Sequence, residues 1–128
     1  MTGAKSLFQN AKIICPEREL SADDQEWEAH TSFTGVWMKH LILGKDTGGG
    51  LSCHLVRVEK GSSIGEHAHE GSLELHEVLS GEGVCRLEGR EIAYAPGVCL
   101  VMPAGVRHEV AAEGGDLYMM ARFTPALM

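Results

Sequence analysis

Two histidines separated by one residue, His67 and His69, lie in a stretch bounded by Gly61 and Gly81. On a β-strand, this spacing places both imidazoles on the same face. Glu74 follows five positions after the second histidine, which leaves enough chain for a turn and a return. Imidazole nitrogens and a carboxylate together form a ligand set that suits a divalent transition metal. The stretch therefore predicts strands arranged around a metal-binding group.

A second stretch, residues 97–112, adds a third histidine. Pro103 and Gly105 bracket a tight turn, and His108 opens the strand expected after it. Together the two stretches resemble the paired motifs of the cupin superfamily. The first motif, Gly-x5-His-x-His-x4-Glu-x6-Gly, is matched by Gly61, His67, His69, Glu74 and Gly81. The second, Gly-x5-Pro-x-Gly-x2-His-x3-Asn, is matched by Gly97, Pro103, Gly105 and His108.

The second motif departs from the family pattern at its last position, where Ala112 replaces Asn. That Asn is not a metal ligand in the family, so the ligand set is complete. The resemblance implies that one divalent metal lies inside a barrel, held by His67, His69, Glu74 and His108. Four protein ligands around an octahedral ion leave two adjacent positions for water, a bidentate substrate or dioxygen. Fe(II) or Mn(II) fits redox or Lewis-acid chemistry best, and Ni, Co and Zn are alternatives because affinity order alone does not choose among them.

Short strands separated by glycine and proline turns follow one another from Thr34 onward. We expect strands at residues 35–43, 51–59, 83–88, 90–94, 98–102, 107–111 and 116–124. Many short strands of this kind are typical of an antiparallel barrel, closed or built from two sheets. The resemblance implies the same all-β fold, a double-stranded β-helix (jelly-roll) cupin barrel. We assign it to residues 34–128, after an N-terminal extension at residues 1–33 with a short edge strand at 12–15 and a short helix from 21 to about 30.

Three further residues are candidates for the site. By strand alternation His76 shares the inward face of Glu74, whereas Glu77 faces away. We interpret His76 as a partner of the metal-binding group or an acid/base near it; a hydrogen-bonded wall residue fits the pattern equally. His54 should point inward, either as a satisfied buried imidazole or as a pocket residue. Arg122 can anchor an anionic substrate if it faces inward.

Composition excludes several classes of function. The 128 residues carry a formal net charge of −7, with the acidic residues spread along the chain, whereas nucleic-acid binding needs a basic face. No apolar run approaches the length of a membrane span. The four cysteines form no CxxC pair, and we expect reduced thiols in a cytoplasmic protein; they are Cys15, Cys53, Cys85 and Cys99.

Two classes of function remain. The first is a metal-dependent enzyme (an oxygenase, an isomerase or epimerase, or a lyase) acting on a small polar metabolite. The second is a non-catalytic cupin that binds or senses a small molecule such as a sugar or organic acid. A sensor would usually need an output domain, and 128 residues leave no room for a helix-turn-helix module, which favours the enzyme. We also expect a homodimer, with the apolar strand at Val36–Leu43 packing across the interface.

Overall fold

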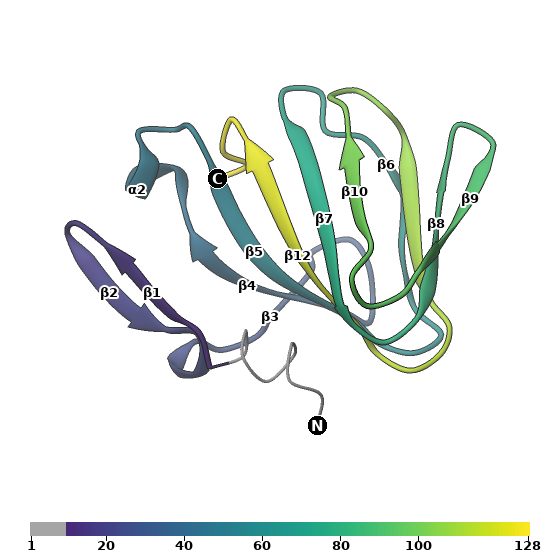
Figure 1. The fold of residues 1–128 in the computed structure, drawn as a ribbon, viewed down its shortest axis with the longest axis horizontal. Helices are drawn as coiled ribbons and strands as arrows, with labels where there is room; N and C mark the ends of the chain where they lie inside the picture. Colours follow the sequence, from purple (N-terminus) through teal and green to yellow (C-terminus); the bar gives the residue numbers. More distant parts are fainter. Residues whose placement is uncertain (1–9) are drawn as a thin grey trace.

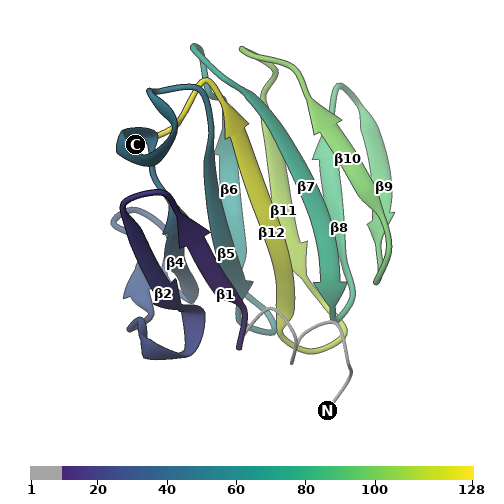
Figure 2. The ribbon, with the colours of Figure 1, turned by 60° about the vertical axis from the view of Figure 1, so that its left-hand side comes forward.

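The computed structural model describes residues 10–128, in which two large antiparallel sheets face each other and a two-stranded sheet precedes them (Figures 1 and 2). The six-stranded sheet comprises, in spatial order, β10 (Cys99–Met102), β7 (Leu73–Ser80), β12 (Leu117–Thr124), β5 (Ser52–Val58), β4 (Val36–Ile42) and β3 (Glu28–Ala29). The four-stranded sheet comprises β6 (Ser63–His67), β11 (His108–Ala112), β8 (Gly83–Leu87) and β9 (Arg90–Tyr94). This is the two-sheet antiparallel barrel that the strand pattern predicted, with the jelly-roll form that the family resemblance implied.

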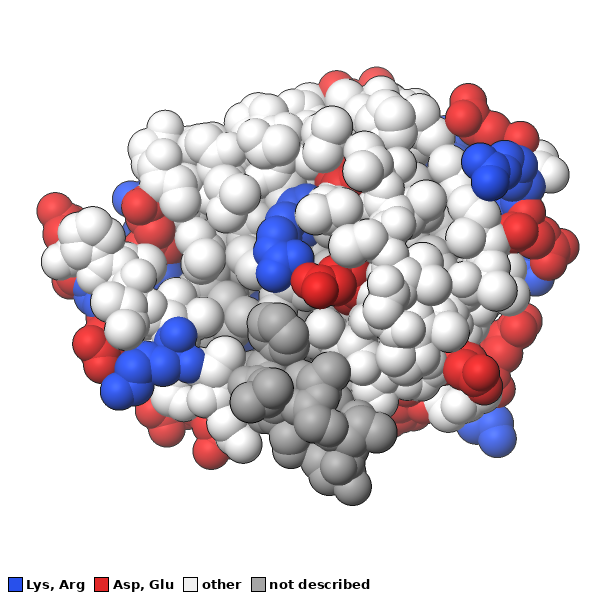
Figure 3. Space-filling view, viewed as in Figure 1, with Lys and Arg blue, Asp and Glu red and all other residues white. Residues whose placement is uncertain are grey.

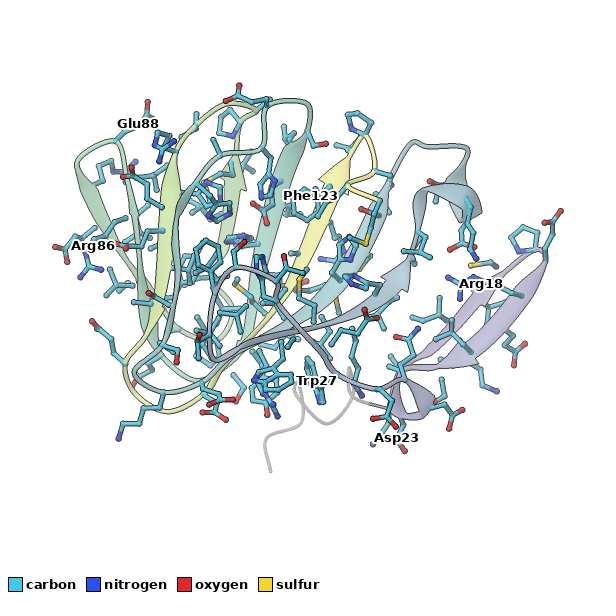
Figure 4. All side chains as sticks on the ribbon, turned by 180° about the vertical axis from the view of Figure 1, so that it is seen from behind. Arg18, Asp23, Trp27, Arg86, Glu88 and Phe123 are labelled. Atoms are coloured by element: carbon cyan, nitrogen blue, oxygen red, sulfur yellow. The ribbon has the colours of Figure 1, made fainter. Side chains whose placement is uncertain are left out.

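The main core lies between the two sheets. Strand alternation explains its composition, because every second side chain of β12 points inward: Met119, Ala121 and Phe123 are buried there. Opposite them, β8 and β11 contribute Cys85 and Val110. Phe123 projects from β12 into the space between the sheets (Figure 4). The intervening residues of β12 therefore face the other side of the six-stranded sheet.

That outer side is covered by the N-terminal extension. Its described part is a hairpin of β1 (Lys12–Cys15) and β2 (Arg18–Ser21), a 3-10 turn, η1 (Ala22–Asp24), and the edge strand β3. The hairpin lies against the outer side of the six-stranded sheet (Figure 2). A second apolar cluster forms beneath it, from Ala22, Leu41, Cys53, Leu55, Leu79, Tyr118 and Met120. The first nine residues of the predicted extension lie outside the described residues.

The extension differs from its prediction in one element. The helix expected from residue 21 to about 30 is limited to the three residues of η1, and Glu28–Ala29 pairs with β4 instead. Tertiary pairing at the edge of the sheet outweighs the helix-start signal of the acidic residues. The edge strand expected at residues 12–15 is confirmed.

A further difference concerns β4 and its expected place at a dimer interface. The segment after β4 forms a short helix, α2 (Gly44–Thr47), in which Asp46 pairs with Arg18 of the hairpin. The outward-facing Lys39 and Leu41 of β4 are buried, Lys39 donating a hydrogen bond to the Ala22 carbonyl of the chain's own extension. This strand therefore does not present the uncovered apolar face on which the predicted dimer contact depended.

Two motif glycines explain the shape of the turns in which they lie, at the far end of β7 and before His108. Gly81 has φ +86°, and a Cβ there would lie 2.1 Å from the carbonyl oxygen of Asp116. Gly105 has φ +80°, and its N–H donates a 2.9 Å hydrogen bond to the carbonyl of His69. Both conformations are ones that L side chains rarely adopt. The hydrogen bond from Gly105 to His69 ties the turn before His108 to the loop that carries His69.

The surface agrees with the acidic composition. On the face seen in Figure 3, basic side chains lie beside acidic ones and form no extended basic area. Among the described residues, no helix is both long and apolar enough to cross a membrane.

Candidate metal centre

The four residues of the cupin motifs converge between the sheets. His67 ends β6, His69 lies in the loop after it, Glu74 is on β7 and His108 begins β11. Register brings two of them together, because His108 is paired directly with His67 across the β6–β11 ladder. One ligand atom from each of the four residues lies within 4.8 Å of the others. Bonds of about 2.0–2.2 Å would put ligand atoms around one ion roughly 3–4.4 Å apart. The cluster is therefore close to the size of one coordination sphere.

Backbone hydrogen bonds aim two of the imidazoles at this point. The Nδ1 atom of His67 lies 2.8 Å from the Gly65 carbonyl oxygen, and Nδ1 of His108 lies 3.0 Å from that of Val106. A carbonyl can only accept, so Nδ1 carries the hydrogen in both rings. The Nε2 lone pair of each neutral ring is consequently free to bind a metal, as in metal-binding histidines generally.

Glu74 and His108 show that the cluster is incomplete by itself. Oε1 of Glu74 and Nε2 of His108 lie 3.2 Å apart. Both atoms are buried, and neither makes a hydrogen bond of acceptable geometry with any described residue. Buried polar atoms are normally satisfied, so a pair of orphaned atoms facing the same point indicates a missing partner. Three imidazoles and one carboxylate fit a divalent transition metal in that place.

Burial and neighbouring charges set the protonation of the ligands. Burial is the largest single influence on Glu74 and acts to raise its pKa, but His76, His108 and His69 together hold that pKa well below its usual range. Burial lowers the pKa of both His67 and His69. The geometry thus favours an ionised carboxylate beside neutral imidazoles, the forms in which these groups bind metals.

His108 behaves differently from the other two imidazoles. Burial alone would lower its pKa, but the Glu74 carboxylate and the Val106 carbonyl outweigh this and raise it. A proton on His108 is thus the best substitute that the chain itself offers for a cation beside Glu74.

His76 supports the site through Glu74. Its Nε2 lies 2.8 Å from Oε2 of Glu74, and its Nδ1 lies 2.8 Å from the hydroxyl oxygen of Tyr94. The carboxylate can only accept, so Nε2 donates, and in the neutral ring Nδ1 accepts from the tyrosine hydroxyl. His76 is 2% exposed and is not among the residues that line the cavity described next. It is placed to orient the carboxylate. No spacing or motif in the sequence indicates Tyr94 as its partner.

A cavity of about 290 Å³ opens beside the cluster. His67, His69 and Glu74 form one part of its wall, and apolar residues of β4, β5 and β12 form much of the rest. The loop after β3 and the C-terminal residues 127–128 also line it. Ligand pockets usually measure about 300–1,000 Å³, so this cavity suits a small metabolite.

The remaining candidates are placed as follows. His54 is fully buried and hydrogen-bonded to His40 and Ser52. Arg122 does not line the cavity: it alternates with the inward-facing Ala121, and its guanidinium binds Glu77 at 2.9 Å. The expectation that Arg122 anchors an anion inside the barrel is therefore not met in this geometry.

Sequence reasoning overlooked His40, which does line the cavity. One signal in the sequence could have identified it. His40 and His54 lie on consecutive expected strands, and if those strands form an antiparallel pair the two rings can meet. Phe123, whose ring lies between His69 and His54 at centroid distances of 4.9 and 5.6 Å, also gave no signal beyond its place in an apolar strand.

Comparison with known proteins agrees with the fold. A curated relative, an oxalate-binding protein of Thermotoga maritima, is 33% identical over 67 residues, which are 52% of this chain and 55% of the relative. The chain thus spans little more than half the length of that relative.

Solved structures extend the likeness over most of the chain. A predicted oxalate decarboxylase of Thermotoga maritima superposes with a TM-score of 0.71 at 27% identity, covering 78% of this chain and 90% of that one. KdgF from a Halomonas species superposes with a TM-score of 0.71 at 23% identity, covering 80% and 90%. The polyketide cyclase RemF of Streptomyces resistomycificus reaches 0.74 at 17% identity, covering 87% and 85%. The last two likenesses concern the fold alone.

The Cupin_2 family model, described as the cupin domain, matches residues 54–121 and so covers just over half of the 128 residues. It includes the complete four-residue cluster and most of both sheets. The chain is therefore a member of the cupin family.

Proposed function

We propose that the protein binds one divalent transition metal through His67, His69, Glu74 and His108 and acts as a metal-dependent enzyme on a small organic acid. The proposal rests on one observation above all. Oε1 of Glu74 and Nε2 of His108 are buried without hydrogen-bond partners, 3.2 Å apart, in a cluster whose ligand atoms lie within 4.8 Å. A divalent cation satisfies both atoms at once.

The residues of the site would have the following roles. A bound metal supplies Lewis acidity or redox chemistry at two open positions. His67 and His108 are held by backbone carbonyls so that Nε2 faces the ion, and His76 fixes the carboxylate of Glu74 from behind. The apolar wall excludes water and restricts the ligand to a small molecule.

The class of ligand is supported by the names of two relatives. One is an oxalate-binding protein and the other a predicted oxalate decarboxylase, both from Thermotoga maritima. A carboxylate with an adjacent oxygen can occupy two neighbouring metal positions. The reaction type remains one of three: oxygenase, isomerase or epimerase, or lyase. Non-catalytic binding of such an acid is the second candidate, because the first of these names denotes a binding protein.

Metal analysis tests the proposal directly. Protein purified anaerobically from metal-replete medium should contain about one equivalent of metal per chain, with Fe(II) or Mn(II) favoured over Ni, Co and Zn. Glu74→Gln should lower the occupancy strongly, whereas Glu70→Gln on the neighbouring loop should not. An equal metal content in all three proteins would refute the proposed site.

Turnover separates the enzyme from the binding protein. The Fe(II)-loaded protein would be mixed with a panel of small organic acids while oxygen consumption and substrate loss are followed. Consumption of one acid, abolished in Glu74→Gln, supports the enzyme. Tight binding of an acid that is recovered unchanged supports the second candidate.

We further propose that the protein is a cytoplasmic homodimer. The exposed apolar side chains that a partner could cover include Ile14 on β1 and Val101 on the edge strand β10, which are 71% and 56% exposed. Light scattering at micromolar concentration should give the mass of two chains, and Val101→Lys should reduce it if β10 forms the contact. Cell fractionation tests the location.

A further inference from the structure

The cavity has a second polar end at His40, which lies on β4, three strands from Glu74 on β7 in the six-stranded sheet. Register places His40, His54, Ala121 and His76 in one row across β4, β5, β12 and β7. Neighbouring strands lie about 4.8 Å apart, so the two ends of the row are separated by roughly 14 Å along the sheet. Ala121 carries only a methyl group in this row, which leaves space above it. The cavity runs through this space, because both His40 and Glu74 line it.

A buried chain of hydrogen bonds fixes the ring of His40. The backbone N–H of Leu127 donates to Oγ of Ser52, which lies 2.8 Å from Nε2 of His54, and Nδ1 of His54 lies 2.8 Å from Nδ1 of His40. Ser52 and His54 are fully buried. Oγ can accept twice, but its hydrogen has no acceptor other than Nε2 of His54 among the described residues. Donation from Oγ to Nε2 is therefore the arrangement that leaves no buried hydroxyl hydrogen unpaired.

This direction determines the tautomer of both rings. His54 must then carry its hydrogen on Nδ1 and donate it to Nδ1 of His40. Burial, with a smaller effect from His40, lowers the pKa of His54 to about 4, which keeps its ring neutral near pH 7. A His40 ring that accepts at Nδ1 carries its hydrogen on Nε2. His40 therefore presents an oriented N–H donor at the cavity wall.

The surroundings of this donor define what it can bind. The wall beside it is apolar and includes Met38, Val56 and Phe123. Oε1 of Glu28 lies 4.0 Å from Nε2 of His40, beyond hydrogen-bond distance but close enough to repel an anion. Among the described residues that line the cavity there is no Lys or Arg. A neutral acceptor, such as a carbonyl or hydroxyl oxygen, suits this end better than a second carboxylate.

We propose that His40 is a specificity-determining residue that hydrogen-bonds the end of the ligand farthest from the metal. The ligand is then a small acid with its carboxylate at the metal, an apolar middle and a neutral oxygen at the other end. This inference rests on the proposed function, because it takes the cluster of His67, His69, Glu74 and His108 as the position of the acid end. His54 and Ser52 are positioning residues.

Binding of matched probes tests the inference. Co(II)-loaded protein would be titrated with pyruvate, which reaches only the metal, and with the terminal methyl monoesters of oxaloacetate, 2-oxoglutarate and 2-oxoadipate. The free diacids and the apolar 2-oxohexanoate serve as comparisons, and the visible absorption of Co(II) gives the affinity. At least one ester should bind more tightly than its free diacid and than 2-oxohexanoate.

Variants of His40 then isolate the donor. His40→Phe should weaken binding of that ester about tenfold, the value of one hydrogen bond, and leave pyruvate unchanged. His40→Gln, which retains an N–H donor, should restore most of the affinity. Equal effects of His40→Phe on ester and pyruvate, no effect on either, or no preference among the probes would overturn the inference. Absence of Co(II) or pyruvate binding in the unaltered protein would refute the proposed function as well.

The hydrogen-bond chain has a test that needs neither metal nor ligand. Long-range ¹H–¹⁵N correlation spectra of the apo protein at neutral pH should show His54 protonated at Nδ1 and His40 at Nε2. A His40 ring whose Nε2 lacks a hydrogen would overturn the assigned donor even if the metal site is correct.

Discussion

At the residue scale, the site contains side chains that could bind a metal directly and side chains that hold those groups in place. The ring of His69 is part of the cluster, and its Nε2 lies 3.7 Å from Oε1 of Glu74. His76 reaches only the other carboxylate oxygen, at 2.8 Å, and is anchored behind by Tyr94. The two histidines should therefore differ in how strongly their loss affects the metal.

We predict that His69→Ala weakens metal binding more than His76→Ala does. Loss of an orienting residue commonly costs roughly 10–100-fold in affinity or activity, whereas loss of a ligand removes a metal bond outright. Both variants should lose any turnover. Metal affinity is measured by competition with a chelator, and His76→Gln, which retains a donor toward Glu74, should recover part of the affinity. If His76→Ala releases the metal as completely as His69→Ala, His76 is itself a ligand.

His54 gives a second residue-scale prediction, in the pH dependence of stability. Its pKa falls from 6.5 to about 4 on folding, so between these values the unfolded chain binds more protons than the folded one. The free energy of unfolding should fall as the pH falls through this window. At pH 4.5 the loss specific to His54 should reach about 2 kcal/mol relative to pH 7.5, since each pKa unit is worth about 1.4 kcal/mol.

Denaturant unfolding of the unaltered protein and of His54→Gln at several pH values measures this effect. Glutamine does not titrate, so the variant should lose less stability on acidification. The titratable groups whose charges act on the pKa of His54 are His40 and Glu74, and both are retained in the variant. Parallel pH profiles for the two proteins would show that His54 does not titrate as described.

The residues of the candidate metal-binding cluster were predictable from sequence, and those proposed to face the ligand were not. His67, His69, Glu74 and His108 were identified by fixed spacings within two motifs. The position of Arg122 depended on which face of β12 points inward, which spacing within one strand does not determine. The face of the sheet on which Arg122 lies is set by the pairing of β12 with its neighbouring strands. The contact of His40 with His54 is likewise set by the pairing of β4 with β5.

At the scale of elements, the strands followed their sequence signals and the helices did not. Alternating side chains and glycine or proline turns predicted the β8–β9 hairpin and β12 to within about two residues. The helix expected after residue 21 was replaced by a 3-10 turn and a sheet pairing at Glu28–Ala29. Local polar residues signal a helix start, but they do not reveal that a nearby sheet edge competes for the same backbone hydrogen bonds.

Trp27 is one of the residues that attach the extension to the six-stranded sheet. Its ring lies 5.0 Å from both the Lys39 ammonium and the Arg57 guanidinium, and it meets Tyr118 edge-on at 6.2 Å. The position of Trp27 beneath the sheet is visible in Figure 4. Two cation–π contacts and an aromatic pair each contribute about 0.5–1.5 kcal/mol beyond the buried area.

We predict that Trp27→Ala lowers the free energy of unfolding by about 2–3 kcal/mol. Asp23→Ala, an exposed change in the same extension, should alter it by less than about 0.5 kcal/mol. Denaturant unfolding measures both, and limited proteolysis should cut the Trp27 variant faster within residues 10–30. Equal stability of the two variants would mean that the extension is held by other contacts.

At the scale of the whole molecule, the cluster joins the two sheets. Glu74 belongs to the six-stranded sheet, whereas His67 and His108 belong to the four-stranded sheet. A metal held by all of them would link the two layers at the open side of the core. Metal binding should therefore be observable as stability of the entire barrel, independently of any catalysed reaction.

We predict that adding metal raises the melting temperature of the apo protein, and that a chelator reverses the rise. A ligand that binds only the folded state at 100 times its dissociation constant stabilises it by about 2.7 kcal/mol. For a domain of this size that corresponds to roughly 8–12 °C. Calorimetry with Mn(II) or Co(II) measures the shift, and Glu74→Gln should abolish most of it. A shift of equal size in Glu74→Gln would place the stabilising ion elsewhere on the molecule, because that variant lacks the carboxylate linking the two sheets at the cluster.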